Sequence, residues 1–176
     1  MKPKVLVLFK AHEDIFETLS DIADVKFIPY EDKDKLIKER KEAEAIIVGV
    51  SPIDKNLLDK APKLKVVARF GVGYDNVDVE ECTKRRIYVT HTPGVLSDAV
   101  AELTIGLMLC LSRNLIAADH YVRTEWAKPK SRKFPLGIDL YNKTLGIIGL
   151  GRIGSAVAKK ASGLGMKIIY HDIVRR

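Results

Sequence analysis

Glutamine is absent from this sequence, cysteine is rare and no long hydrophobic run occurs. Charged residues flank even the apolar run from Leu103 to Leu111, which falls short of the ~20 residues that a membrane-spanning helix requires. The two cysteines, Cys82 and Cys110, lie far apart without CxxC spacing, no Cys/His spacing indicates a metal site, and no secretory segment begins the chain. We therefore expect a cytoplasmic protein with two reduced thiols and no membrane partner.

The net charge of +7 does not follow the pattern of a nucleic-acid-binding surface. Most lysines alternate with acidic residues, as in residues 31–44, which is typical of a solvated helix face. Uncompensated basic clusters occur at residues 128–133 and at Arg175 and Arg176, with no aromatic or amide side chains between them as base readers. We expect no nucleic-acid partner, and binding through residues 128–133 is a minor alternative. The lack of glutamine beside abundant lysine and glutamate favours a thermophilic source.

Short apolar runs alternate with segments of helical periodicity over the first ~90 residues. This alternation predicts an α/β fold with a parallel, doubly wound sheet, and hence a flavodoxin-like domain. The expected strands are residues 4–9, 25–29, 45–50, 65–70 and 87–90, and the expected helices are residues 13–23, 33–43, 54–61 and 79–85.

A long helix is expected after the proline-glycine break that follows this domain. Ser97 or Asp98 can cap its start, and it should run to about residue 126. Between residues 99 and 111 it is apolar on nearly every face, with only Glu102 charged. Such a helix should be covered on more than one side, by the next domain or by a second copy. Glu102 could be a buried acid with a functional partner, but a cap or a structural pairing is the simpler interpretation.

A glycine fingerprint, GLGRIG, occupies residues 149–154. It follows an expected strand at residues 144–148 and opens an expected helix that runs to residue 164, which is followed by a strand at 167–170. Asp172 comes 18 residues after the last glycine of the fingerprint. Strand, glycine turn, helix, strand and acid in this order predict the first βαβ unit of a Rossmann dinucleotide-binding domain.

Each glycine of the fingerprint has an expected role. Gly149 makes the tight turn, Gly151 lets the pyrophosphate approach the backbone, and Gly154 lets the helix pack close to the strand. The free N–H groups and positive dipole end of the helix would face the phosphates. The expected cofactor-binding residues here are Gly149, Gly151, Arg152, Ile153 and Gly154.

Asp172 is expected to select the cofactor. Its carboxylate would accept hydrogen bonds from the adenosine ribose hydroxyls and repel a 2′-phosphate, which favours NAD over NADP. Arg175 and Arg176 keep the alternative open, because a guanidinium can pair with that phosphate.

A second glycine turn, GVGYDN at residues 71–76, ends the fourth expected strand. Ligands bind at this end of the strands in open α/β sheets, and free backbone N–H groups here could hold a small carboxylate. On the residues alone, a plain strand-to-helix turn is the simpler interpretation.

Three motifs in order, RFGVGYDNVD, THTPGVLSDAVAELTIGLML and NKTLGIIGLGRIG, resemble the D-isomer-specific 2-hydroxyacid dehydrogenases, in their glyoxylate/hydroxypyruvate reductase and phosphoglycerate dehydrogenase branches. The resemblance covers residues 4–172. It implies a substrate domain at residues 1–95, and a bridging helix with an incomplete NAD-binding domain at residues 96–176.

The resemblance also implies roles for individual residues. The Val72 and Gly73 amides would hold the carboxylate of a small 2-hydroxy or 2-oxo acid, and Val100 and Thr104 would lie beside the nicotinamide. The long helix would help to form a homodimer.

The catalytic arginine, glutamate and histidine of that family follow the strand that Asp172 ends, so none is expected here. Of the four histidines, His91 lies nearest the expected cleft, whereas His12, His120 and His171 have simpler structural explanations. We expect an N-terminal portion of a dehydrogenase that is inactive and self-associating as isolated. The alternative is a non-catalytic nucleotide- or carboxylate-binding module, possibly completed by a partner chain.

Overall fold

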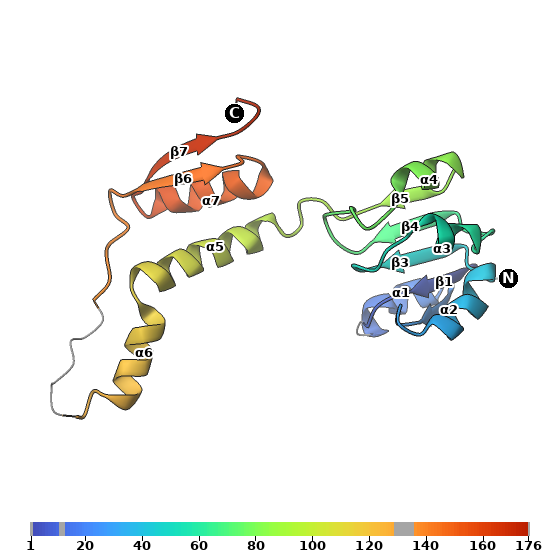
Figure 1. The fold of residues 1–176 in the computed structure, drawn as a ribbon, viewed down its shortest axis with the longest axis horizontal. Helices are drawn as coiled ribbons and strands as arrows, with labels where there is room; N and C mark the ends of the chain where they lie inside the picture. Colours follow the sequence, from blue (N-terminus) through green and yellow to red (C-terminus); the bar gives the residue numbers. More distant parts are fainter. Residues whose placement is uncertain (1, 11–12, 129–135, 176) are drawn as a thin grey trace. The chain divides into compact units, whose positions relative to one another are not determined.

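Short parallel strands joined by helices form two α/β units (Figure 1). The computed structural model describes residues 2–10, 13–128 and 136–175. One unit is Met1–Pro93 and the other is Gly94–Arg176. The α/β class expected from the sequence is confirmed.

The first unit contains a five-stranded, all-parallel sheet with the strand order β2-β1-β3-β4-β5. Its strands are β1 Lys4–Val7, β2 Asp24–Phe27, β3 Ala45–Val48, β4 Val66–Arg69 and β5 Tyr88–Thr90. Its helices are η1 Glu13–Phe16, α1 Glu17–Ser20, α2 Lys33–Glu39, η2 Arg40–Glu42, α3 Lys55–Asp59 and α4 Val79–Lys84. The doubly wound parallel sheet predicted from the alternation is therefore present.

Aspartate caps begin three of these helices. The side chains of Asp32, Asp54 and Asp78 accept hydrogen bonds from the backbone N–H three residues on, at 3.2, 2.8 and 2.9 Å. Helix α1 has no such cap at Phe16, and the helix expected over residues 13–23 is a 3₁₀ turn followed by a short α-helix that ends at Ser20. A helix whose first N–H groups have no side-chain acceptor is more costly to begin.

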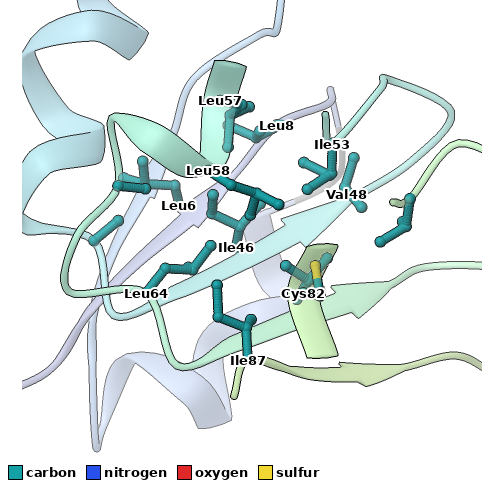
Figure 2. Packing of buried hydrophobic residues seen from close by; sticks show 14 of the residues in the cluster. Leu6, Leu8, Ile46, Val48, Ile53, Leu57, Leu58, Leu64, Cys82 and Ile87 are labelled. Carbon is teal, nitrogen blue, oxygen red and sulfur yellow. The ribbon is translucent and has the colours of Figure 1, made fainter. Parts of the chain in front are cut away.

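The main core cluster of the first unit lies between the sheet and helices α2, α3 and α4 (Figure 2). Strand residues such as Leu6, Ile46 and Val48 are fully buried, and Leu58 from α3 packs over them. Cys82 from α4 belongs to the same cluster, where burial raises the pKa of its thiol. Both cysteines are free, as expected.

The second unit is built on two parallel strands, β6 Thr144–Ile148 and β7 Lys167–His171, joined by helix α7 Arg152–Gly163. Helix α5 Ser97–Ser112 packs against α7, and α6 Leu115–Thr124 follows α5. This strand-helix-strand arrangement is the βαβ unit predicted from the glycine fingerprint.

The expected single long helix is two helices. α5 ends at Ser112, and α6 begins after Asn114, which has a left-handed backbone with φ of 51°. The Asn114 side-chain amide donates to the Leu136 carbonyl, which holds the break in place. Asparagine tolerates this conformation better than most residues, so the chain turns here at little cost. The two helices bend by 55°.

The start of α5 also differs from the expectation. Leu96 precedes its first turn without a side-chain hydrogen bond, so neither Ser97 nor Asp98 is the cap. Asp98 instead lies 3.2 Å from Lys160 of α7. Within the described ranges, no single helix is long and apolar enough to cross a membrane, and α5 and α6 meet that length and composition test only as a bent pair.

Within the part of the chain that the structure describes, helix α5 is covered on one side only. Ala101 is fully buried, whereas Leu103, Leu107 and Leu111 are 63%, 55% and 77% exposed. Glu102 is also exposed, and it pairs with Lys160 at 3.2 Å. The structural pairing that the sequence favoured for Glu102 is therefore present, and it is not the buried acid of the alternative.

Candidate cofactor and carboxylate sites

The glycine turn joins β6 to α7 in a left-handed bend. Gly149 has φ of +89°, and its N–H donates to the His171 carbonyl of β7 at 2.8 Å. Gly151 is the N-cap position of α7. The first N–H groups of a helix lack partners within it, so those of Arg152 and Ile153 are oriented towards the open end of the turn.

The space around the turn fits the three glycine roles. A Cβ at Gly154 would overlap the Gly149 carbonyl oxygen, so only glycine allows this approach of helix to turn. A Cβ at Gly151 would meet no atom within 4 Å, which leaves the backbone open on that side. These residues fit a dinucleotide pyrophosphate, whose approach needs an uncovered backbone at a helix N-terminus.

Asp172 follows β7 and lies against the same turn. One carboxylate oxygen, Oδ2, accepts the Leu150 N–H at 2.6 Å, and Oδ1 accepts the Val174 N–H at 3.1 Å. The acid and the glycine turn are therefore one hydrogen-bonded unit. The sequence pattern indicated Asp172 but not its bond to Leu150, since that bond depends on how the second strand ends beside the turn.

The other expected cofactor-binding residues, Val100 and Thr104, lie on helix α5. Val100 and Thr104 are one turn apart on α5, where the Thr104 hydroxyl donates to the Val100 carbonyl at 2.8 Å. Arg175 is exposed, and Arg176 lies outside the described residues. Most of the basic cluster at residues 128–133 also lies outside them, and Lys128 pairs with Glu125 at 3.0 Å.

The second glycine turn follows β4 in the first unit. Gly71 has φ of +150°, which favours glycine. Val72 and Gly73 are exposed, and no described residue accepts a hydrogen bond from either N–H. Two neighbouring free amides at the carboxyl end of a strand can bind a small anion.

This loop is tied to the end of β3 by a side chain that sequence reasoning missed. The Asn76 amide nitrogen donates to the carbonyls of Gly49 and Ser51 at 3.2 and 2.7 Å. Its oxygen accepts the Arg69 Nε–H at 3.2 Å. The available signal was an asparagine within a glycine-rich turn, since short amides often bond to nearby backbone.

A pocket of about 600 Å³ opens at the carboxyl ends of β1 and β3, where the strand order reverses. Its lining includes Phe9, Lys10 and Ser51. Ser51 is the residue whose carbonyl Asn76 contacts, so the pocket adjoins the second glycine turn. Ligands of open α/β sheets bind at such a reversal.

Of the four histidines, His91 contacts a candidate site. It follows β5 and lies against the second glycine turn, with its Nδ1 atom 2.8 Å from the Val72 carbonyl oxygen. His120 is exposed on α6, His171 ends β7, and His12 lies outside the described residues. No group of metal-binding side chains occurs in the part of the chain that the structure describes.

Comparison with known proteins places these features in one family. The family model described as D-isomer specific 2-hydroxyacid dehydrogenase, catalytic domain, matches residues 5–171. A glyoxylate reductase from Pyrococcus horikoshii is 46% identical, over 100% of this chain and 55% of the relative. One from Thermococcus litoralis is 44% identical, over 100% of this chain and 56% of the relative.

Solved structures agree. A 2-hydroxyacid dehydrogenase from Ketogulonicigenium vulgare superposes with a TM-score of 0.88 at 33% identity, covering 99% of this chain and 56% of that one. An NADPH-dependent glyoxylate/hydroxypyruvate reductase from Sinorhizobium meliloti, in complex with NADP and malonate, gives 0.85 at 35% identity, covering 100% and 55%. The chain, which spans about half the length of the curated relatives it matches, belongs to the D-isomer specific 2-hydroxyacid dehydrogenase family.

Proposed function

We propose that this chain is the N-terminal part of an NAD-dependent dehydrogenase that transfers a hydride between a nicotinamide cofactor and a small 2-hydroxy or 2-oxo acid of the glyoxylate type. The observation that carries the proposal is the glycine turn, in which the backbone contact at Gly154 excludes a side chain while Gly151 stays open. The similarity to glyoxylate reductases supports the substrate class.

The two units have separate tasks in this proposal. In the second unit, the turn from Gly149 to Gly154 binds the pyrophosphate, Asp172 binds the ribose, and Val100 and Thr104 lie beside the nicotinamide. In the first unit, the Val72 and Gly73 amides hold the substrate carboxylate. When bound, the nicotinamide supplies or accepts the hydride.

A preference for NAD over NADP follows from Asp172. Its carboxylate is held at the turn by the Leu150 N–H, where it would repel the 2′-phosphate of NADP. The Sinorhizobium meliloti relative is NADPH-dependent and was solved with NADP, so membership of the family does not by itself exclude NADP. Arg175, three residues on, is the side chain that could offset the repulsion.

Residues 1–176 alone are proposed to bind cofactor without turnover, because the family resemblance assigns the catalytic arginine, glutamate and histidine to the segment after Asp172. The test compares NADH binding by calorimetry with glyoxylate-dependent NADH oxidation. Binding without oxidation is expected. Oxidation abolished by a glycine-turn variant would show that this chain carries catalytic groups of its own, and no binding at millimolar NADH would contradict the cofactor site.

The chain is further proposed to act in the cytoplasm and to self-associate. Free cysteines fit a reducing compartment. The exposed leucines of α5 form an apolar stripe of the kind that a second copy would cover.

A further inference from the structure

The segment His91–Thr92, just after β5, lies against the loop of the proposed carboxylate site. The Thr92 N–H donates to the Gly71 carbonyl at 2.9 Å. The His91 Nδ1 atom lies 2.8 Å from the Val72 carbonyl oxygen. Two consecutive residues of one segment therefore contact two consecutive carbonyls of the other.

These carbonyls belong to the peptides that carry the proposed binding amides. A peptide group is planar and trans, so its C=O and N–H point in opposite directions. The Gly71 carbonyl shares its plane with the Val72 N–H, and the Val72 carbonyl shares its plane with the Gly73 N–H. Holding the two carbonyls from behind therefore orients both N–H groups away from the clamp.

The hydrogen bond also defines the state of the imidazole. A carbonyl oxygen only accepts, so Nδ1 must carry the hydrogen. The His91 ring makes an edge contact with Tyr74 of the same loop, with centroids 5.0 Å apart and planes at 74°. The ring is therefore held at two points of the loop, although it is exposed to solvent.

We propose that His91 is a positioning residue for substrate binding: its Nδ1–H fixes and polarises the Val72–Gly73 peptide so that the Gly73 N–H is presented to a carboxylate. This inference rests on the proposed function, which assigns the carboxylate to these amides. A donor to the carbonyl strengthens the hydrogen bond made by the N–H of the same peptide, because neighbouring hydrogen bonds polarise one another.

The bond adds little to folding, because the Val72 carbonyl is on an exposed loop where water can replace His91. Loss of the bond should instead weaken ligand affinity, because the freed Val72–Gly73 peptide would then have to be ordered on binding. Loss of one neutral hydrogen bond corresponds to about a five-fold weaker affinity.

The test uses residues 1–176 with oxalate as the carboxylate probe. Titrations followed by ¹H–¹⁵N spectra should shift the Val72 and Gly73 amide signals in the unaltered chain. His91→Ala should weaken oxalate binding about five-fold. His91→Asn should restore it to within about two-fold, because the asparagine amide can donate from the position of Nδ1. His120→Ala, on the exposed face of α6, is the matched control and should change nothing.

Two measurements separate positioning from general damage. Residual dipolar couplings without ligand should show a changed Gly73 N–H orientation in His91→Ala but not in His91→Asn, with the thermal midpoint unchanged. Long-range ¹H–¹⁵N spectra of the His91 imidazole should show that Nδ1 carries a hydrogen. An unchanged orientation, or an unchanged affinity for oxalate in His91→Ala, overturns the role of His91. If oxalate perturbs neither amide in the unaltered chain, the proposed carboxylate site is wrong and the role of His91 falls with it.

Discussion

At the scale of single residues, the surroundings of two glycines in α7 explain why one of them cannot be replaced by alanine and the other can. Gly154 and Gly163 both belong to α7. The first faces the Gly149 carbonyl, whereas a Cβ at the second would meet nothing within 4 Å. The same substitution should therefore have opposite effects at the two ends of one helix.

Gly154→Ala should destabilise the chain by about 1–3 kcal/mol, because the added methyl must push the helix away from the turn. It should also weaken NADH binding. Gly163→Ala, the control, should stabilise the helix by about 0.5–1 kcal/mol. Urea unfolding and NADH titration measure both effects, and equal stability of the two variants would contradict the packing role of Gly154.

Asp172 should decide between the two nicotinamide cofactors. Asp172→Asn keeps an oxygen that can accept the Leu150 N–H but removes the charge that opposes a 2′-phosphate. The ratio of NADPH to NADH affinity should rise by about tenfold, the weight of one hydrogen bond to a charged group. Competition titrations check the ratio, and an unchanged value would assign the selection to another residue.

At the scale of elements, ion pairs and caps hold the helices on the first sheet. Glu39 of α2 contacts Lys4 of β1 and Lys26 of β2, each at 2.9 Å. Hydrogen bonds from Lys26 and then Lys4 lower the pKa of this carboxyl below its usual value of 4.5. A group with a lowered folded pKa stabilises the fold above its unfolded pKa and loses that contribution as the pH falls.

The stability of the first unit should therefore decrease as the pH falls from about 5 through the pKa of Glu39 in the folded state. Glu39→Gln should lower stability at neutral pH and flatten this acid-side decrease. Exposed Glu17, whose Gln variant is the control, makes no ion pair within the described residues. Urea unfolding between pH 3 and pH 7 measures the slopes; identical slopes for Glu39→Gln and the unaltered chain would refute the contribution.

Capping gives a second check on element stability. Asp54 accepts the Leu57 N–H at the start of α3, whose Leu58 packs into the core. Asp54→Ala should cost about 1 kcal/mol, and Asp54→Asn should cost much less because asparagine also caps. Chemical denaturation compares the two, and an equal loss would mean that charge rather than capping is responsible.

At the scale of the whole molecule, exposed apolar surface predicts association. Leu103, Leu107 and Leu111 recur every four residues along α5, on one exposed face. Leu107→Glu should shift residues 1–176 towards monomer in sedimentation velocity. Ile22→Glu, at a 68% exposed position in the first unit, is the control. A monomeric unaltered chain, or equal shifts for both variants, would contradict association through α5.

The order of elements and the two glycine turns could be predicted from local patterns, because strand and helix periodicities and glycine turns depend on neighbouring residues. The break at Asn114 could not, since it depends on the contact of its side chain with Leu136, 22 residues later. A structural partner for Glu102 was expected, but its identity could not be predicted, because Lys160 belongs to another helix, 58 residues away.

The sequence by itself determined the α/β class and the position of Asp172 after the second Rossmann strand, because these follow from residue order and spacing. It also indicated the family, through the resemblance of three motifs. Only the tertiary structure decided which atoms meet: Asp172 with the Leu150 N–H, Asn76 with the end of β3, and His91 with the Val72 carbonyl. Such contacts join segments distant in sequence, and their geometry depends on strand register and loop direction, which no local pattern specifies.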